Sequence, residues 1–284
     1  MRIGYLGPEG TFSQAAALTA PAAATAELIA LPTNFDVVVA VQEGLVDRAV
    51  VAIENSYEGS VTATLDALAF ETSSAKIVGE VVLPIEQCLI ASGPIELQEI
   101  EVVISHPQAT GQCSRFIRDR LPDVQIQTAS STADAVRLVS ERIRHTWAAI
   151  GNRLAADIYG CSILRAGIED LSGNETRFVW IAPEEATPGA PGATESRGPW
   201  KTSLVFWGSG AESPGWLVRC LDELSSRSVN MTRIESRPRR QGLGRYMFFV
   251  DIEGRDSDPR VNDALSALGG HVELLRVLGS YPTS

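Results

Sequence analysis

Cysteine and histidine are scarce in this sequence, and neither occurs in a pattern that binds metal. The 284 residues include four cysteines and three histidines. No two cysteines form a C-x-x-C pair, and the histidines are widely separated, which excludes the usual zinc spacings. We therefore expect isolated, buried thiols in a reducing compartment. The cysteines are Cys88, Cys113, Cys161 and Cys220.

Basic residues are also in the minority. Lys and Arg number 24 against 35 Asp and Glu, which gives a formal net charge of −11. Binding to nucleic acid requires clustered Lys and Arg that neutralise phosphates, so this composition argues against a nucleic-acid partner. If the ligand is an anion, its positive contacts must be few and local.

Long apolar runs are missing as well. The N-terminus predicts a strand at residues 3–6 and lacks the charged, apolar and cleavage regions of a signal peptide. The alanine-rich stretch 15–30 contains Pro21 and Glu27, so we expect it not to span a bilayer. The sequence predicts a cytoplasmic protein with no membrane partner.

Several common catalytic motifs are absent. The sequence contains no G-x-x-x-x-G-K-[ST], no H-E-x-x-H and no G-x-S-x-G, which argues against the usual nucleotide-hydrolase, zinc-peptidase and α/β-hydrolase sites. Gly208, Gly210 and Gly215 do not have G-x-G-x-x-G spacing, so a dinucleotide site is not expected there.

What the sequence does contain is an alternation of short apolar strands and helices. Residues 183–199, PEEATPGAPGATESRGP, predict a linker between two parts of the chain. In the first part, a block at about 84–165 has its own strands and helices and is expected to form a lobe inserted into the first. Strands are predicted at 3–6, 28–31, 49–53, 77–83, 88–91, 102–105, 124–128, 147–151 and 178–182, and helices at 33–45, 107–121 and 130–143.

The last 85 residues or so follow a different plan. Strands at 202–207, 229–236, 245–252 and 272–278 alternate with helices at 214–224 and 259–268. That order, βαββαβ, predicts a ferredoxin-like domain over 200–284. The overall expectation is an α/β protein with a two-lobed domain at 1–182, and with ligands bound where parallel strands end between the lobes.

Polar segments follow three of the predicted strands, and a fourth polar segment leads into the predicted strand 178–182. Residues 7–13 read GPEGTFS, and Thr11 or Ser13 can cap the next helix, so this loop is either structural or ligand-binding. Residues 53–61 read IENSYEGSV and place Asn55 and Ser56 at a strand end. Residues 105–113 read SHPQATGQC, where Ser105 is a natural helix cap and His106 is either a capping residue, which we favour, or a general base. Residues 174–178 read NETRF.

Together these segments closely resemble the prephenate dehydratase family. SSTADA at 130–135, AAIGNRLAADIYG at 148–160, MTRIESRP at 231–238 and YMFFVDIEG at 246–254 add to the match, and the motifs occur in family order across nearly the whole chain. The resemblance implies a two-lobed catalytic domain like that of type 2 periplasmic binding proteins, followed by an ACT regulatory domain, in a homodimer or homotetramer.

The resemblance also implies a reaction and a set of residues. Prephenate loses its ring carboxylate as carbon dioxide and its hydroxyl as water to give phenylpyruvate, a step of phenylalanine synthesis. Because aromatisation drives this step, no metal, redox cofactor or covalent nucleophile is expected. Thr176 would be the catalytic hydrogen-bond donor, and Arg177 a carboxylate clamp. The expected substrate-binding residues are Thr11, Asn55, Ser56, Ser105, Gln112, Arg177 and Phe178.

Phenylalanine is the effector that the resemblance implies for the ACT domain. The family's usual Gly-Ala-Leu motif is here Gly215-Trp216-Leu217, and the larger Trp216 either fills the effector pocket or faces a partner. Tyrosine or another amino acid is an alternative effector. The expected effector-binding residues are Gly215, Trp216, Leu217, Glu235, Ser236 and Arg237.

Three other functions fit parts of the pattern. Arogenate dehydratase performs the same chemistry on an aminated substrate, and the sequence does not separate the two. A non-catalytic amino-acid sensor would use both domains for binding, but the intact NETRF and SHPQ segments argue against it. A solute-binding protein outside the cytoplasm would need a signal segment.

Overall fold

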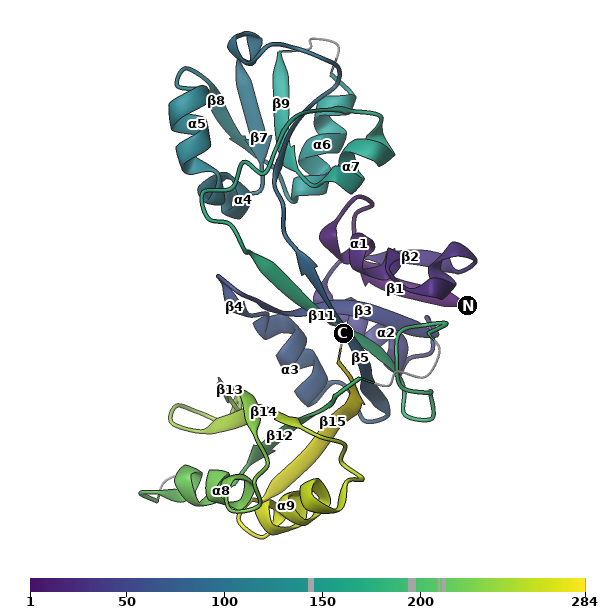
Figure 1. Cartoon of the computed structure of the whole chain (residues 1–284), viewed down its shortest axis with the longest axis vertical. Helices are drawn as coiled ribbons and strands as arrows, with labels where there is room; N and C mark the ends of the chain where they lie inside the picture. The colour runs from purple at the N-terminus through teal and green to yellow at the C-terminus, as the bar shows by residue number, and fades with distance from the viewer. Residues whose placement is uncertain (143–145, 194–197, 209, 211–212, 284) are drawn as a thin grey trace.

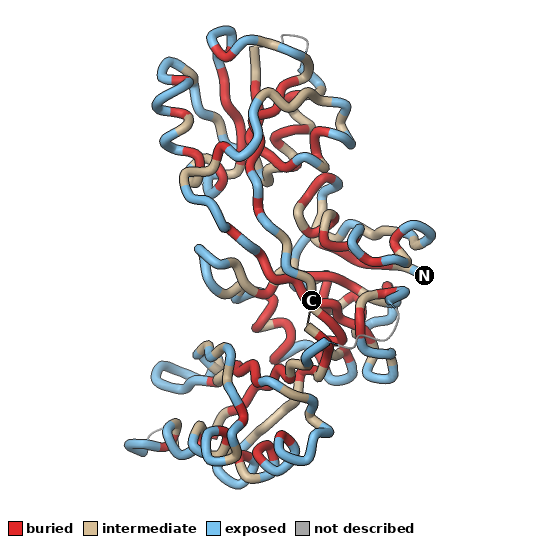
Figure 2. Tube along the Cα trace, in the orientation of Figure 1, coloured by how far each residue is buried: buried red, intermediate tan, exposed pale blue. Residues whose placement is uncertain are grey.

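The computed structural model describes residues 1–142, 146–193, 198–208, 210 and 213–283, and these form three sheets stacked along the long axis of the molecule (Figure 1). His145, the end of the predicted helix 130–143, residues 194–197 of the predicted linker and Ser209 lie outside the described residues. The mixed α/β fold predicted from the sequence is confirmed. Figure 2 shows that buried stretches follow the strands of each sheet, whereas the connecting loops are largely exposed.

The first sheet occupies the middle of the molecule. Its β1, β2 and β3 are parallel, and β11 runs antiparallel between β3 and β5. The short β4 pairs with the end of β3. The order is β2 (Glu27–Leu31), β1 (Arg2–Leu6), β3 (Arg48–Asn55), β11 (Glu175–Pro183) and β5 (Ala75–Pro84), with β4 at Gly59–Ser60; the helices are α1 (Phe12–Leu18), α2 (Asn34–Gln42) and α3 (Thr62–Phe70).

The second sheet forms a separate lobe, at the top of Figure 1. All its strands lie in the sequence between β5 and β11, so the chain crosses between the lobes twice. The order is β10 (Ser162–Ala166), β6 (Cys88–Ala91), β9 (Trp147–Gly151), β7 (Val102–Ser105) and β8 (Gln125–Thr128); the helices are α4 (Pro107–Gln112), α5 (Ser114–Arg120), α6 (Thr132–Ser140) and α7 (Arg153–Tyr159).

Local capping explains where several of these helices begin. Thr33 caps α2 and Ser131 caps α6, each through a side-chain oxygen that accepts a backbone N–H. The helix predicted over 107–121 is two helices, because Cys113 (φ −113°, ψ 19°) leaves the helical region between α4 and α5. The cap of α4 is His106, whose Nδ1 accepts from the Gln108 N–H at 3.3 Å. The favoured capping role of His106 is therefore confirmed.

The third sheet is antiparallel and follows the predicted βαββαβ order. One face is covered by α8 and α9. The other face packs on the first lobe, where Val205, Phe249 and Tyr281 join a single apolar core with residues of α2, α3, β3 and β5. The strands are β13 (Met231–Pro238), β14 (Tyr246–Glu253), β12 (Trp200–Trp207) and β15 (Leu274–Pro282), with α8 at Trp216–Ser225 and α9 at Pro259–Gly269.

The described part of the predicted linker, residues 183–193, is in contact with the first lobe. Arg48 donates to the carbonyl oxygens of Thr187 and Gly189 at 2.9 and 2.8 Å, and Ala186 packs on the core around Trp180. The composition of this segment predicted a linker between the two parts of the chain. Up to residue 193, backbone contacts with the first lobe hold it in place instead.

Candidate active site

A cavity of about 430 Å³ lies between the two lobes, where the parallel strands end. The first lobe contributes Thr11, Asn55, Thr176 and Phe178, and the second contributes Gln112. The lobes also touch beside it, since Asn152 Nδ2 donates to the Gly10 carbonyl at 2.9 Å. Four of the seven expected substrate-binding residues and the expected catalytic residue thus line one cavity. Other lining residues are Phe12, Ser60, Val61, Ile85, Gln87, His106, Gln108, Ser130, Ser131 and Thr132.

Thr176 lies on β11, with its side chain toward the cavity. The residue is 9% exposed, and its hydroxyl oxygen accepts a hydrogen bond from Asn55 Nδ2 at 2.9 Å. A hydroxyl has one proton to donate in addition to its acceptor lone pairs. Because the Asn55 amide occupies the acceptor side, the Thr176 proton is available to a group in the cavity.

Asn55 anchors the loops around Thr176. Its Nδ2 also contacts Asn174 Oδ1 at 2.7 Å, and its Oδ1 accepts from the N–H groups of Tyr57 and Glu58, both at 3.0 Å. These contacts join the end of β3 to the loop that enters β11. Asn55 lines the cavity as expected, but its amide is engaged in holding Thr176 and these loops.

Two expected substrate-binding residues are used elsewhere. Ser105 is fully buried, and its Oγ donates to the Ile150 carbonyl at 2.7 Å, which ties β7 to β9. Ser56 Oγ accepts from the Glu175 N–H at 2.9 Å and supports the loop beside the cavity. Neither side chain belongs to the cavity lining. Ser105 also does not cap α4, because β7 extends through it.

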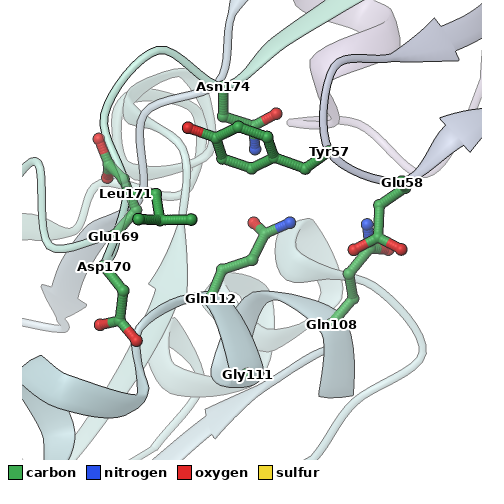
Figure 3. A pocket seen from close by; sticks show the side chains of 9 residues that line it. All are labelled: Tyr57, Glu58, Gln108, Gly111, Gln112, Glu169, Asp170, Leu171 and Asn174. Atoms are coloured by element: carbon green, nitrogen blue, oxygen red, sulfur yellow. The ribbon is translucent and has the colours of Figure 1, made fainter.

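Thr11 and Gln112 line the cavity from opposite lobes. The Thr11 hydroxyl caps α1 by accepting from the Gln14 N–H at 3.2 Å and donates to the Leu6 carbonyl at 2.7 Å. Gln112 ends α4, and Figure 3 shows its amide pointing into an adjoining hollow, toward Tyr57 and Asn174. Gln112 is therefore a better placed ligand contact than Thr11, whose hydroxyl already bonds twice to backbone.

Arg177 does not reach the cavity. Successive strand residues point to opposite faces, so Thr176 faces the cavity and Arg177 faces away from it. Its guanidinium contacts Asp251 at 2.6 Å, Glu54 at 3.1 Å and Glu80 at 3.3 Å. With three carboxylates around it, Arg177 is not a substrate clamp, and that expectation was wrong.

The expected effector residues do not converge within the described chain. Gly215 (φ +77°) precedes α8, and the Trp216 side chain turns inward, where its Nε1 donates to the His271 carbonyl at 2.8 Å. Leu217 packs on the core of the third sheet. On β13, Ser236 is exposed and Glu235 is half-buried, whereas Arg237 pairs with Asp66 of α3 at 3.0 Å. Of the two alternatives for Trp216, the inward one holds.

Gln87 is a cavity residue that the sequence reasoning missed. It lies in the first crossing between the lobes and is 3% exposed. Its Nε2 contacts Gln112 Oε1 at 3.5 Å, while its Oε1 is buried without a hydrogen-bond partner among the described residues. In either orientation of the amide, one polar end is available to a ligand. A polar residue in the short crossing between two apolar strands was the signal available.

The thiols take no part in the cavity lining. Cys113 is fully buried, and burial with nearby Glu169 and Asp170 raises the pKa of its thiol to about 12. Cys88 and Cys220 are also buried, as predicted, whereas Cys161 is half-buried.

Among the described residues, no three His, Cys, Asp or Glu side chains lie close enough together to form a metal site. No helix in the described part of the chain is long and apolar enough to cross a membrane.

Comparison with known proteins places the chain in a family. Residues 3–186 match the sequence model described as prephenate dehydratase. The chain belongs to the prephenate dehydratase family. The bifunctional chorismate mutase/prephenate dehydratase of Neisseria gonorrhoeae is 39% identical over 284 residues, which cover 100% of this chain and 75% of that protein.

Solved structures of similar proteins extend over the whole chain. Prephenate dehydratase from Arthrobacter aurescens, in complex with L-Phe, is 38% identical with a TM-score of 0.85, covering 99% of this chain and 90% of that one. GqqA, described as a novel type of quorum quenching acylase, is 29% identical with a TM-score of 0.82, covering 100% and 98%. The family fold therefore also occurs in a protein described by a different activity.

Proposed function

We propose that this chain converts prephenate to phenylpyruvate, carbon dioxide and water. One observation supports the proposal beyond family membership: Thr176 lines the cavity between the lobes, and its hydroxyl accepts from Asn55 Nδ2, which leaves its own proton to donate. The bond between ring and carboxylate breaks and carbon dioxide leaves, its electron pair enters the ring, and the ring C–O bond breaks as the leaving oxygen takes up a proton that comes ultimately from solvent and departs as water. A donor aimed at that oxygen stabilises the charge that develops on it.

The cavity would bind a dianion without a Lys or Arg side chain. Among the lining residues that the structure describes, there is no Lys or Arg. The donors are hydroxyls, side-chain amides and backbone N–H groups, including those of the first turn of α6 at Ser131 and Thr132. The N–H groups of a first helical turn lack intrahelical partners and favour anions. We propose that such donors replace the arginine clamp.

A product assay with alternative substrates tests this proposal. Purified protein is incubated with prephenate, and phenylpyruvate is followed by its absorbance in alkali. Parallel incubations contain arogenate, with detection of phenylalanine, and an N-acyl amide, with detection of the released acid. We expect turnover with prephenate. Product from arogenate alone would assign the aminated substrate, and amide cleavage alone would place the chain with the acylase.

Gln87→Met is expected to weaken substrate binding without harming the fold. The substitution removes a buried acceptor that has no partner in the free protein, so the free energy of unfolding should stay equal or rise. Loss of a hydrogen bond to the substrate should raise KM about tenfold. Steady-state kinetics and urea unfolding measure the two effects.

Gln14→Met is the matched control for Gln87. Gln14 is also buried, but its Oε1 accepts from the Gly10 N–H at 2.6 Å, and it does not line the cavity. Its replacement should lower the free energy of unfolding and leave KM unchanged. An unchanged KM in Gln87→Met would remove Gln87 from the binding site.

We propose further that residues 200–284 form an ACT domain that binds phenylalanine, in a homodimer or homotetramer. The βαββαβ order and the similar structure determined with L-Phe support the proposal. The buried Trp216 ring fills space at the start of α8, so the effector would bind around it rather than in its place. Activity measured with and without millimolar phenylalanine tests the effector, and light scattering tests the assembly; equal activity would contradict control by phenylalanine.

A further inference from the structure

A buried group of charges lies behind the strand that carries Thr176. Arg177 is surrounded by Glu54 of β3, Glu80 of β5 and Asp251 of β14, at 2.6 to 3.3 Å. The Arg177 side chain is 10% exposed, that of Glu80 4% and that of Asp251 3%. The third sheet therefore supplies one of the carboxylates that hold an arginine of the first sheet.

Two further cations of the third sheet complete this cluster. Lys201 of β12 contacts Glu80 at 2.8 Å, and Arg233 of β13 contacts Glu54 at 3.6 Å. Three cations thus face three carboxylates, so the formal charges balance; the Glu54 side chain, at 37% exposed, also meets solvent. A buried ion pair that loses one partner leaves an uncompensated charge, which makes such contacts selective for one docked arrangement. The cluster consists of Arg177, Lys201, Arg233, Glu54, Glu80 and Asp251.

Hydroxyl groups of the third sheet fix Asp251 in turn. Its Oδ1 accepts from Ser203 Oγ at 2.6 Å, and Ser203 Oγ lies 2.7 Å from Tyr281 Oη. Its Oδ2 is left for Arg177. Burial alone would lower the pKa of Arg177, but nearby Asp251 raises it above its ordinary value, so the guanidinium stays charged. Asp251 is therefore held on one side by its own sheet and on the other by β11.

The cluster contacts two strands that line the candidate active site, β11 and β4. Arg177 is the neighbour of Thr176 on β11. On β4, Ser60 lines the cavity, and its Oγ accepts from Arg233 Nη2 at 2.6 Å. The third sheet thus reaches both β11 and β4 from behind.

The pairing of β3 with β11 is irregular at this point. Thr176 pairs with Asn55 and Arg177 with Glu54, but Phe178 pairs with Ala52, so the register shifts beside the cavity. A bulge interrupts the ladder and leaves a residue unpaired. On its other edge β11 pairs regularly with β5 here, Thr176 with Leu83 and Arg177 with Val82, so the irregularity affects only the β3 side. On that side, the contact of Arg177 with Glu54 joins the two strands next to the register shift.

We propose that Asp251 and Arg233 are positioning residues, through which the docked third sheet holds β11 and β4 so that the Thr176 hydroxyl meets its substrate. The inference rests on the proposed function. In this proposal the third sheet supports catalysis by positioning Thr176, even when no effector is bound. A small misplacement of a reacting group is enough to slow a reaction strongly, even when the substrate still binds.

Asp251→Asn in the full chain tests this inference. Asparagine keeps the volume and the contact with Ser203 but removes the charge opposite Arg177. We expect kcat for prephenate to fall about 10- to 100-fold, with KM little changed because the cavity lining is intact. Hydrogen exchange of the peptide containing residues 174–178 should become faster in the folded variant.

Asp66→Asn is the matched control. Asp66 of α3 pairs with Arg237 at 3.0 Å and Arg240 at 3.2 Å, so it also joins the first lobe to the third sheet, but it does not line the cavity. Its replacement should leave kcat and the exchange of residues 174–178 unchanged. An equal loss of kcat in Asp66→Asn would overturn the inference, because docking in general would then be responsible.

Three further outcomes are distinguishable. If Asp251→Asn does not fold, Arg233→Gln removes the contact behind β4 and leaves Arg177 with all three carboxylates, and a fall in kcat with KM retained would support the inference. A folded Asp251→Asn protein with kcat and exchange like the parent would overturn it. If the parent itself does not convert prephenate, the proposed function fails, and the exchange measurement alone decides whether Asp251 holds β11.

Discussion

Thr176→Val is expected to lower kcat for prephenate by about 10²- to 10³-fold, because it removes one hydrogen-bond donor from the developing charge on the leaving oxygen. Valine has nearly the shape of threonine, so the packing around the cavity should persist. Asn55 loses one acceptor but keeps its contact with Asn174 Oδ1 at 2.7 Å. Steady-state kinetics with prephenate, together with thermal unfolding, measure the effect.

Thr176→Ser provides the control for that substitution. Serine keeps the hydroxyl and should retain much of the parent activity, since Asn55 Nδ2 can still occupy its acceptor side. If valine and serine variants had equal turnover, the hydroxyl would have no part in the reaction. The remaining activity of the family fold would then have to arise from binding and orientation alone.

Trp216→Ala is expected to lower the free energy of unfolding by about 3–5 kcal/mol, since it leaves a large cavity in a core. The ring lies 6.1 Å from that of Phe206 and 6.0 Å from that of Phe248, centroid to centroid, and it donates a hydrogen bond to the His271 carbonyl. Backbone close to the ring at Gly208 and Gly210 cannot easily fill the space. Urea unfolding monitored by circular dichroism measures the change.

Val218→Ala is a matched control on the same helix. Val218 is two positions further along α8 and 69% exposed, so its truncation should change the free energy of unfolding by no more than about 0.5 kcal/mol. Equal stabilities of the Trp216 and Val218 variants would show that the ring does not support the core of the third sheet.

The architecture was largely predictable because its signals are local. Alternating strands and helices indicated the α/β lobes, and the βαββαβ order of the last domain is visible in its apolar pattern. Boundaries were less certain: the helix predicted over 107–121 is broken at Cys113, and β10, a short strand after α7, was not predicted. The composition of residues 183–193 gave no sign of the contacts with Arg48, which come from more than a hundred residues away.

The site was predictable at the level of its motifs but not of each side chain. Thr176, Asn55 and Gln112 come from three distant segments. The resemblance to the family predicted that they belong to one site. Arg177 was misassigned because its charge suggested a ligand contact, whereas strand alternation turns it away from Thr176.

Other residues of the site needed the tertiary structure. Ser105 looked like a helix cap, but it is the last residue of β7, its hydroxyl bonds to the Ile150 carbonyl, and His106 caps α4 instead. Gln87 belongs to no motif and is defined by an unpaired buried oxygen. Asp251 lies in the segment 246–254 that matched the family, but its role depends on a contact between the third sheet and β11.

The point where the second lobe joins the first has a consequence for how such proteins diversify. Pro84 and Glu175 are partners on adjacent antiparallel strands, so the whole second lobe is attached at the tip of what would otherwise be a hairpin. A turn of two to five residues is enough to close a hairpin. The second lobe could therefore be exchanged, in evolution or by design, for a domain with another specificity. The strand order of the first sheet would stay the same.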